Sequence, residues 1–267
     1  MDVRTRITDA LAPVGLNLVG VASVGAWDAV MPEARRSDVL LPGAKSIVVV
    51  GSGGGALWEA FLADLRRDPR GLTGEKNPLD AFVRRQVERV EVPGPHRWFR
   101  TAADETTHID FRMAAFLAGL GSQSRLGLLL HPVYGTWVGL RAACFTTEDL
   151  EPDVPGGPDL CQWCEAPCVA ACPGGAFPNG KWEVDPCGAF HFDSDRCART
   201  CHAREACPVG AEHRYPDAEI AYHYARASGR RWLCAHLGVA DGEDAFEGEG
   251  PFWQDWRKRV NVTGEKR

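Results

Sequence analysis

The chain has 267 residues, of which 45% are hydrophobic and 25% charged, with a formal net charge of −6. This balance is that of an ordinary globular protein with room for one large domain or two modest ones. It argues against a broad phosphate-binding surface, so DNA is not expected as a partner. The N-terminus lacks the apolar core of a signal peptide and no apolar run is long enough to span a bilayer, which predicts a cytoplasmic protein without membrane contact.

Residues 1–150 are predicted to form an α/β domain. Apolar residues recur at helical spacing in several segments, and β-branched apolar runs bounded by glycine indicate strands between them. Helices are expected at 4–13, 56–68, 79–90 and 107–121. Strands are expected at 15–24, 40–51, 96–102, 125–132 and 136–145, the last two paired with each other.

An acidic segment rich in Pro and Gly, 148–159, is predicted to be a linker. Residues 155–215 are rich in turns and show little apolar periodicity. Such a segment buries too little apolar surface to fold alone, so bound metal is expected to stabilise it. Residues 216–267 are expected to form a C-terminal helix, at 219–238, that packs on the first domain and is followed by an acidic tail.

Eight of the ten cysteines gather in this second segment, and two of them are followed by proline. They are Cys161, Cys164, Cys168, Cys172, Cys187, Cys197, Cys201 and Cys207. Eight thiolates suit two [4Fe–4S] clusters, and two Cys₄ zinc sites are the alternative. The other two cysteines, Cys144 and Cys234, stand in apolar surroundings and are expected to be small buried hydrophobes.

The spacing of the thiols favours iron–sulfur clusters over zinc. Zinc sites take one close pair from each of two separated knuckles, whereas here three close thiols are trailed by a fourth in a Cys-Pro pair. In two-cluster ferredoxins the trailing Cys-Pro thiolate ligates the other cluster. Cluster one is therefore predicted to use Cys161, Cys164, Cys168 and Cys207, and cluster two to use Cys172, Cys197 and Cys201.

From here the chain resembles the corrinoid-dependent family of epoxyqueuosine reductases and reductive dehalogenases. The resemblance rests on LLPGAKSIVVV (40–50), on AGLGSQSRLGLLLHPVYGTWVGLRAACFTTEDL (118–150) and on WEVDPCGAF (182–190). The family places a lone cysteine at the last of these, so the resemblance gives Cys187 to cluster two.

The resemblance implies a nitroreductase-like, cobalamin-binding domain at 1–150 and a ferredoxin-like 2[4Fe–4S] domain at 155–215. A carboxylate before the AGLG helix is thought to be the acid in the reductase, and that register points to Glu105 with Asp104 beside it. A carboxyl group in an apolar corrin pocket would have a raised pKa. The alternative is that this segment only caps the following helix.

Other candidate site residues belong to a glycine loop and to the 118–150 block. Gly51, Gly53 and Gly54 lie between a strand and a helix, where backbone N–H groups can cradle a phosphate of cobalamin or, as an alternative cofactor, of FMN. Tyr134 is a candidate proton donor, and Arg125 and His131 are candidates for holding an anionic substrate or a corrin side chain. Structural roles are the alternative for each.

The resemblance predicts an oxidoreductase whose clusters pass electrons to a corrinoid for reductive chemistry on a small molecule, with reduced ferredoxin or flavodoxin as donor. The alternative is an electron-transfer protein without its own substrate site. TGEKNPLDAFVRRQVERV replaces the family's cobalamin-contacting stretch, and about fifty residues replace the repeat region that grips tRNA. Binding of tRNA is therefore predicted to be unlikely.

Overall fold

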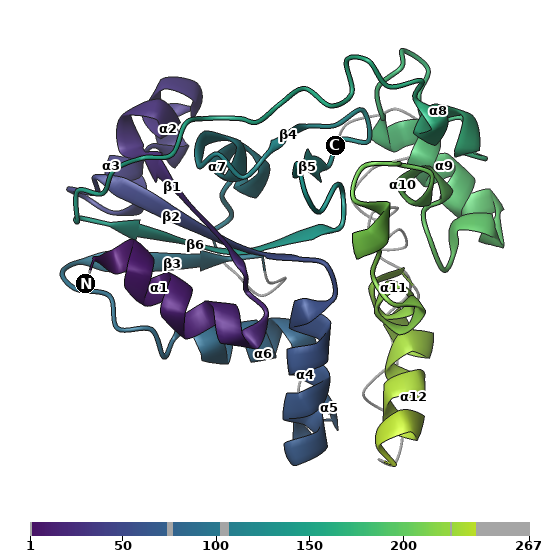
Figure 1. The fold of residues 1–267 in the computed structure, drawn as a ribbon, viewed down its shortest axis with the longest axis horizontal. Coiled ribbons are helices and arrows are strands. Elements are labelled where there is room, and N and C mark those ends of the chain that lie inside the picture. The colour runs from purple at the N-terminus through teal and green to yellow at the C-terminus, as the bar shows by residue number, and fades with distance from the viewer. Residues whose placement is uncertain (1, 74–76, 102–106, 225, 239–267) are drawn as a thin grey trace.

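Four antiparallel strands form the central sheet, in the order β1–β2–β6–β3 (Figure 1). The computed structural model describes residues 2–73, 77–101, 107–224 and 226–238. The strands are β1 Leu18–Ser23, β2 Ser46–Gly53, β3 His96–Arg100 and β6 Val138–Thr146. With helices on both faces of this sheet, the mixed α/β class predicted for the first domain is confirmed.

Among the described residues, seven α-helices accompany the sheet: α1 Val3–Leu11, α2 Val24–Val30, α3 Ser37–Leu40, α4 Ala56–Arg67, α5 Arg70–Thr73, α6 Pro78–Val87 and α7 Phe111–Leu117. The thiol-rich segment contributes α8 Pro167–Ala171, α9 Val184–Asp193 and α10 His202–Glu205. The chain then forms α11 Asp217–Tyr224 and α12 Arg226–Leu237. The single helix predicted at 219–238 is thus replaced by two.

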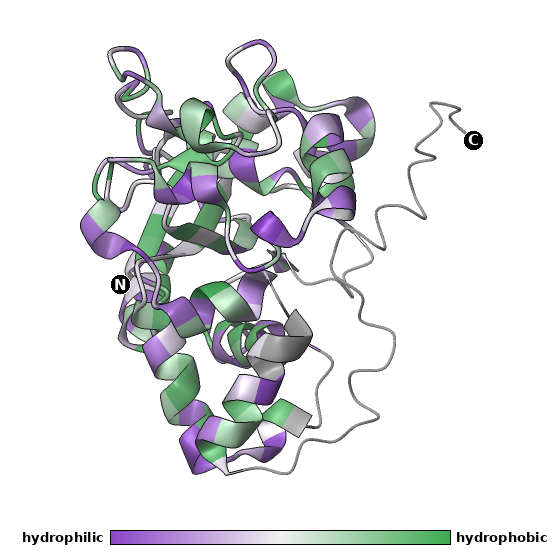
Figure 2. Ribbon diagram, turned by 90° about the vertical axis from the view of Figure 1, so that its right-hand side faces the viewer, coloured by the Kyte–Doolittle hydropathy of each residue, from purple (hydrophilic) through white to green (hydrophobic). Residues whose placement is uncertain are grey.

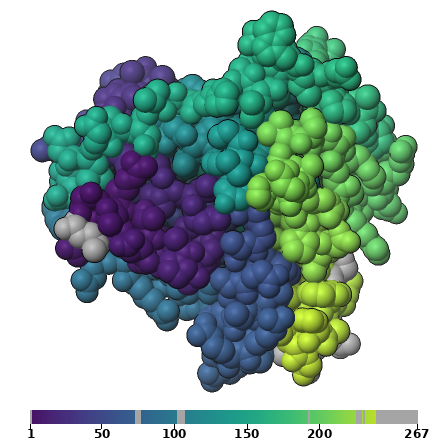
Figure 3. Space-filling model, viewed as in Figure 1, coloured from purple at the N-terminus to yellow at the C-terminus, as the bar shows by residue number. Residues whose placement is uncertain are grey.

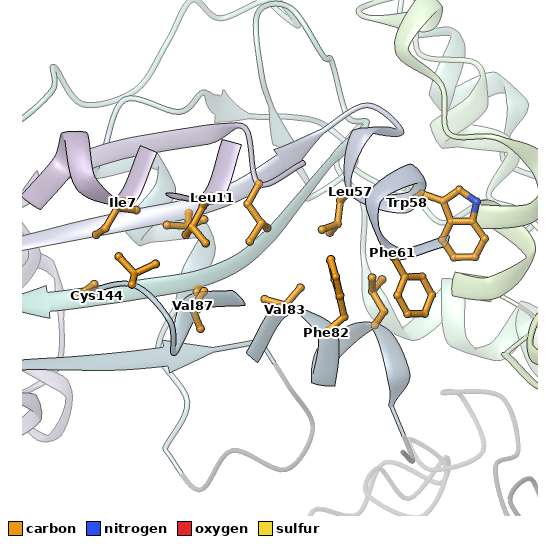
Figure 4. Packing of buried hydrophobic residues seen from close by; sticks show 14 of the residues in the cluster. Ile7, Leu11, Leu57, Trp58, Phe61, Phe82, Val83, Val87 and Cys144 are labelled. Carbon is orange, nitrogen blue, oxygen red and sulfur yellow. The ribbon is translucent and has the colours of Figure 1, made fainter. Parts of the chain in front are cut away.

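Alternation along β2 divides the core into two layers. Val48 and Val50 join the layer built with α1, α4 and α6, while Ile47 and Val49 join the layer built with α2 and α7. Successive side chains of a strand point to opposite faces, so a strand covered by helices on both sides is apolar throughout. Figure 4 shows the first layer, with Cys144 of β6 among its apolar side chains. In Figure 2 the helices carry both hydrophobic and hydrophilic residues, as expected of helices that cover a core with one face.

The prediction that 125–132 and 136–145 pair with each other is wrong. A short strand, β5 Leu129–Leu130, pairs with β4 Ser122–Gln123, whereas β6 lies between β2 and β3. Between β5 and β6 the chain turns tightly: His131 and Gly135 form a backbone bridge, and the Nδ1 atom of His131 accepts from the N–H groups of Val133 and Tyr134. This turn redirects the chain, so β6 enters the larger sheet.

The acidic segment after β6 is fastened to the first domain by Asp153. One carboxylate oxygen of Asp153 accepts from the backbone N–H of Val21 at 2.9 Å, and the other accepts from Arg4 Nη1 at 3.0 Å. The linker therefore runs along the sheet domain as an ordered strap.

We expect Asp153→Ala to lower the free energy of unfolding by about 1–3 kcal/mol, because it leaves the N–H of Val21 without its acceptor. Asp149→Ala is the matched control, since the Asp149 side chain is 80% exposed and its only described partner, Lys45, lies 4.0 Å away. Chemical denaturation of both variants measures the difference. Equal losses would show that the strap contact contributes nothing.

The C-terminal helices pack on the first domain, as predicted. The ring of Tyr222 in α11 lies 5.3 Å from that of Trp58 and 6.0 Å from that of Phe61, both in α4. Figures 1 and 3 show α11 and α12 beside α4, with the thiol-rich segment above them. In the part of the chain that the structure describes, no helix has the length and apolarity needed to cross a membrane.

Candidate metal-cluster site

Four thiols form a first group around α8. The pKa of Cys168 is raised by burial and then by the neighbouring Cys207, Cys161 and Cys164. The pKa of Cys207 is raised by burial and by Cys161 and Cys164. These four side chains therefore lie close enough to interact electrostatically, although Cys207 is 39 residues or more from the others in a chain that folds back on itself.

The remaining four thiols form a second group around α9 and α10. Burial raises the pKa of Cys197 to about 11, with Cys201, Cys172 and Cys187 contributing. The pKa of Cys187 is raised by burial and by Cys201 and Cys172. Cys172 thus interacts with thiols that come after it, whereas Cys168, only four residues before it, interacts with the first group.

Backbone N–H groups point at several of these sulfur atoms. The amide of Ala176 donates to Cys172 Sγ at 3.5 Å. Amides of Ala203 and Arg204 donate to Cys201, and each lowers its pKa against the effect of burial. N–H···S bonds of this kind stabilise thiolates and tune the potentials of iron–sulfur clusters.

No three Cys, His, Asp or Glu side chains among the described residues are arranged to hold a single metal ion. A [4Fe–4S] cluster is larger than one ion and is held at its corners by four thiolates. Each of the two groups contains four thiols that lie close enough to interact electrostatically. The assignment of individual ligands stays a prediction.

The part of the chain that forms the sheet and the thiol-rich segment meet at two glycines. A Cβ atom on Gly135, in the turn before β6, would lie 1.7 Å from the backbone oxygen of Val209. A Cβ atom on Gly210 would lie 2.3 Å from the carbonyl carbon of Tyr134. Both glycines have positive φ, at +57° and +67°. The turn and the segment after Cys207 therefore touch backbone to backbone, which requires glycine on both sides.

The predicted glycine loop is occupied by protein groups. The N–H of Gly53 donates to Asn17 Oδ1 at 2.7 Å and that of Gly54 to the backbone oxygen of Trp137 at 2.9 Å. A Cβ atom on Gly53 would overlap the ring of Tyr134. Gly51, two residues earlier, lies within β2. Phosphate binding at this loop stays a prediction, and it would have to displace these bonds.

Tyr134 and His131 belong to one group of tilted aromatic rings. The ring of Tyr134 lies 5.1 Å from that of His131 and 4.7 Å from that of His213, which follows the thiol-rich segment. Its hydroxyl lies 3.4 Å from Asn17 Nδ2. Burial, followed by the charge of His213, lowers the pKa of His131.

Arg125 lies beside the first thiol group. Its guanidinium donates to the backbone oxygen of Cys161 at 3.3 Å. It lines a polar hollow together with Lys181 and Cys161, and this hollow shares Gln123 and Gly127 with a more apolar one against α7. Asp104 and Glu105, the predicted acids, lie outside the described residues.

A charge cluster with no signal in the sequence pattern is made of Arg141 in β6, Arg204 in α10 and the buried Glu219 in α11. Arg204 lies 4.5 Å from the ring centre of Trp137 and 5.0 Å from that of Tyr215, and its Nη2 donates to the oxygen of Thr136 at 2.7 Å. Arg204 follows Cys201 by three residues, so it ties the second thiol group to the sheet domain. Helical spacing identified the α11 segment but could not show that Glu219 faces inward.

The mixed α/β fold agrees with the coarse architecture that the sequence resemblance implied. The nitroreductase-like and ferredoxin-like character of its two parts stays a prediction. No family model matches the chain. The epoxyqueuosine reductase of Synechococcus sp. (strain RCC307) is 24% identical over 259 residues, which cover 88% of this chain and 73% of that protein. The epoxyqueuosine reductase of Bacillus subtilis (strain 168) is 31% identical over 166 residues, covering 57% of this chain but only 40% of that protein.

Solved structures agree in fold. An epoxyqueuosine reductase with a tRNA-Tyr epoxyqueuosine-modified stem loop has a TM-score of 0.51 and 18% identity, covering 81% of this chain and 68% of that chain. CblC, a B12-trafficking protein of C. elegans, has a TM-score of 0.56 and 11% identity, covering 90% and 96%. The resemblance to the epoxyqueuosine reductases is confirmed.

The prediction that tRNA is an unlikely partner is wrong. It rested on the length of the chain beyond residue 215. The similarity to the protein solved with a tRNA stem loop extends over 81% of this chain, so most of the fold is shared with an RNA-bound reductase.

Proposed function

We propose that this chain is a cytoplasmic iron–sulfur oxidoreductase in which two [4Fe–4S] clusters pass electrons to a corrinoid held by the α/β domain. The proposed substrate is the epoxyqueuosine nucleoside of a tRNA stem loop, reduced with electrons from ferredoxin or flavodoxin. The observation that carries the proposal is the division of eight thiols into two groups of four, with Cys172 and Cys207 each grouped away from their nearest sequence neighbours.

The residues of the chain have separable tasks in this proposal. The thiolates hold the clusters, and the N–H groups of Ala176, Ala203 and Arg204 stabilise the sulfur charge. A bound corrinoid supplies a strongly reducing metal centre. Arg125 and Lys181, in the hollow beside Cys161, supply positive charge for a phosphate or carboxylate. Tyr134, or the acids at 104 and 105, would supply the proton.

Anaerobic purification followed by metal analysis tests the first step. We expect a brown protein with about eight irons and about eight labile sulfides per chain. Zinc at about two per chain in a colourless protein would instead identify two Cys₄ sites and defeat the redox proposal.

Titration with hydroxocobalamin tests the second step. We expect a stoichiometric change in the visible spectrum of the corrinoid, and retention of an epoxyqueuosine-containing tRNA stem loop on the loaded protein. The control is the same stem loop without the modified nucleoside. The loaded protein is then incubated with the stem loop and a reductant. Mass spectrometry that detects loss of the epoxide oxygen from the nucleoside establishes the reaction.

A second candidate function is an electron-transfer protein that reduces a partner enzyme. The observation that favours it is α6, which occupies the stretch where the family contacts cobalamin. Leu79, Phe82 and Val83 of this helix are buried in the core and are not free to line a cofactor site. A protein with about eight irons but no spectral response to hydroxocobalamin would support this alternative.

A further inference from the structure

The buried charge cluster lies where the thiol-rich segment, the C-terminal helices and the sheet meet. Glu219 is only 2% exposed, and its Oε2 atom has no hydrogen-bond partner among the described residues. The Nε atoms of Arg141 and Arg204 are likewise buried without a partner in the described part of the chain. Burying a carboxylate with an unsatisfied oxygen is costly, so a neutral carboxyl is favoured here.

Charged or titratable groups from several elements face Glu219. Arg141 comes from β6, Arg204 from α10 and Glu59 from α4. Within α11, the Nε2 atom of His223 lies 3.7 Å from Glu219 Oε1, and Tyr215 precedes the helix. Burial raises the pKa of Glu219 to about 8. The guanidinium groups of Arg141 and Arg204 lower this pKa, and the carboxylate of Glu59 raises it. Its charge therefore changes near neutral pH.

The same cluster reaches the second thiol group by two routes. Arg204 donates its backbone N–H to Cys201, and its positive charge also lowers the pKa of that thiol. Tyr224, five residues after Glu219 at the end of α11, lies near Arg204, Cys201 and Cys187. Arg204 acts on both Cys201 and Glu219, and charges at buried sites are poorly screened, so we expect a change of charge at these sulfurs to affect Glu219.

We propose that Glu219 is a redox-linked proton site of the second cluster, an inference that rests on the function proposed above. At a pH where Glu219 is ionised, reduction of that cluster by a one-electron donor is accompanied by the binding of one proton from solvent to the carboxylate of Glu219. One electron and one proton enter, no covalent bond between heavy atoms is made or broken, and the net charge of the interface is unchanged.

The sign of the effect follows from this linkage. An added electron makes the surroundings of Glu219 more negative and favours its protonated form, and protonation of Glu219 in turn favours the reduced cluster. The reduction potential of the second cluster should therefore fall as the pH is raised through the range in which Glu219 titrates.

Potentiometric titrations of the iron-loaded protein with dithionite, followed by electron paramagnetic resonance between pH 6 and pH 10, test the proposal. The relevant signal is the one absent from a Cys172→Ala variant. We expect its potential to fall with pH in the unsubstituted protein and to lose most of that dependence in Glu219→Gln. Glu212→Gln, at a side chain that is 71% exposed, should behave like the unsubstituted protein.

A potential that does not change with pH in the unsubstituted protein overturns the redox link, and so does an unchanged slope in Glu219→Gln. Protein that binds no iron defeats the proposed function and this inference together, while iron-loaded protein with a pH-independent potential defeats this inference alone.

A stability measurement checks the buried carboxyl separately. Because the folded pKa is raised, its contribution to stability is fully present below the ordinary pKa of 4.5 and is lost as the pH rises to about 8. Glu219→Gln should remove this decline, so the variant gains relative stability above pH 8. An identical pH profile for both proteins would show that Glu219 is not held as described.

Discussion

Replacing Cys172 by Ala should remove the same cluster as replacing Cys197, although Cys172 stands only four residues after Cys168. We expect each variant to fall from about eight irons to about four, and the two to give the same residual electron paramagnetic resonance signal after reduction. Cys207→Ala and Cys161→Ala should form the other matching pair, with the complementary signal. The reason is the grouping of the thiols: Cys172 interacts with Cys197 and Cys201, whereas Cys207 interacts with Cys161 and Cys168.

Cys144→Ala and Cys234→Ala are the controls. Both side chains are buried in the apolar core away from the two groups, so iron should stay at about eight per chain. A Cys172→Ala variant that matches Cys161→Ala instead would show that each cluster takes four consecutive thiols. Loss of all iron in every variant would show that the segment folds only when both clusters are bound, since metal binding and folding are linked.

Gly135→Ala should destabilise the contact between the two domains by about 2–5 kcal/mol, the second large effect that we expect. The new methyl group would meet the backbone of Val209, which cannot turn aside as a side chain could, at a positive φ that alanine disfavours. Val209 follows Cys207 by two residues, so the same variant should also lose iron from the first cluster more readily on heating.

Two other glycines separate the effect of backbone strain from the effect of the close backbone approach. Gly238 has a φ of +64° and Gly25 has an ordinary φ, and a Cβ atom on either would meet nothing within 4 Å. Thermal unfolding should therefore show a loss of about 1–2 kcal/mol for Gly238→Ala from backbone strain alone, and no loss for Gly25→Ala. If Gly135→Ala were as mild as Gly238→Ala, the close backbone approach would not exist in solution.

Much of the first domain could be predicted because its signals are local. The β-branched run before Gly51 predicted β2, and helical spacing predicted α4 at 56–68 against an observed Ala56–Arg67. The predicted ligand partition followed a local rule, that a Cys-Pro thiol crosses to the other cluster, except for Cys187, which the family resemblance assigned. The electrostatic neighbours of Cys168 and Cys197 fall into the same two sets, while the ligation of a cluster by each thiol stays a prediction.

Other features depend on contacts between distant segments, which periodicity does not report. Nothing local shows that β6 pairs with β2 and β3, since any of the apolar strands could be its partner. Gly135 and Gly210 are each ordinary turn residues until they are seen to meet. Glu219 lies in a helix of mixed character, and only the packing of α11 on β6 and α10 shows that it is buried.

The cysteine-rich segment is held against the sheet domain at both ends, by Asp153 before it and by Tyr222 after it. An electron carrier on a loose tether can swing between donor and acceptor, but a carrier fixed on two sides cannot. Under the proposed function, the tunnelling distances from the clusters to a corrinoid held by the sheet domain would therefore be constant, and the electron donor would have to come to the protein.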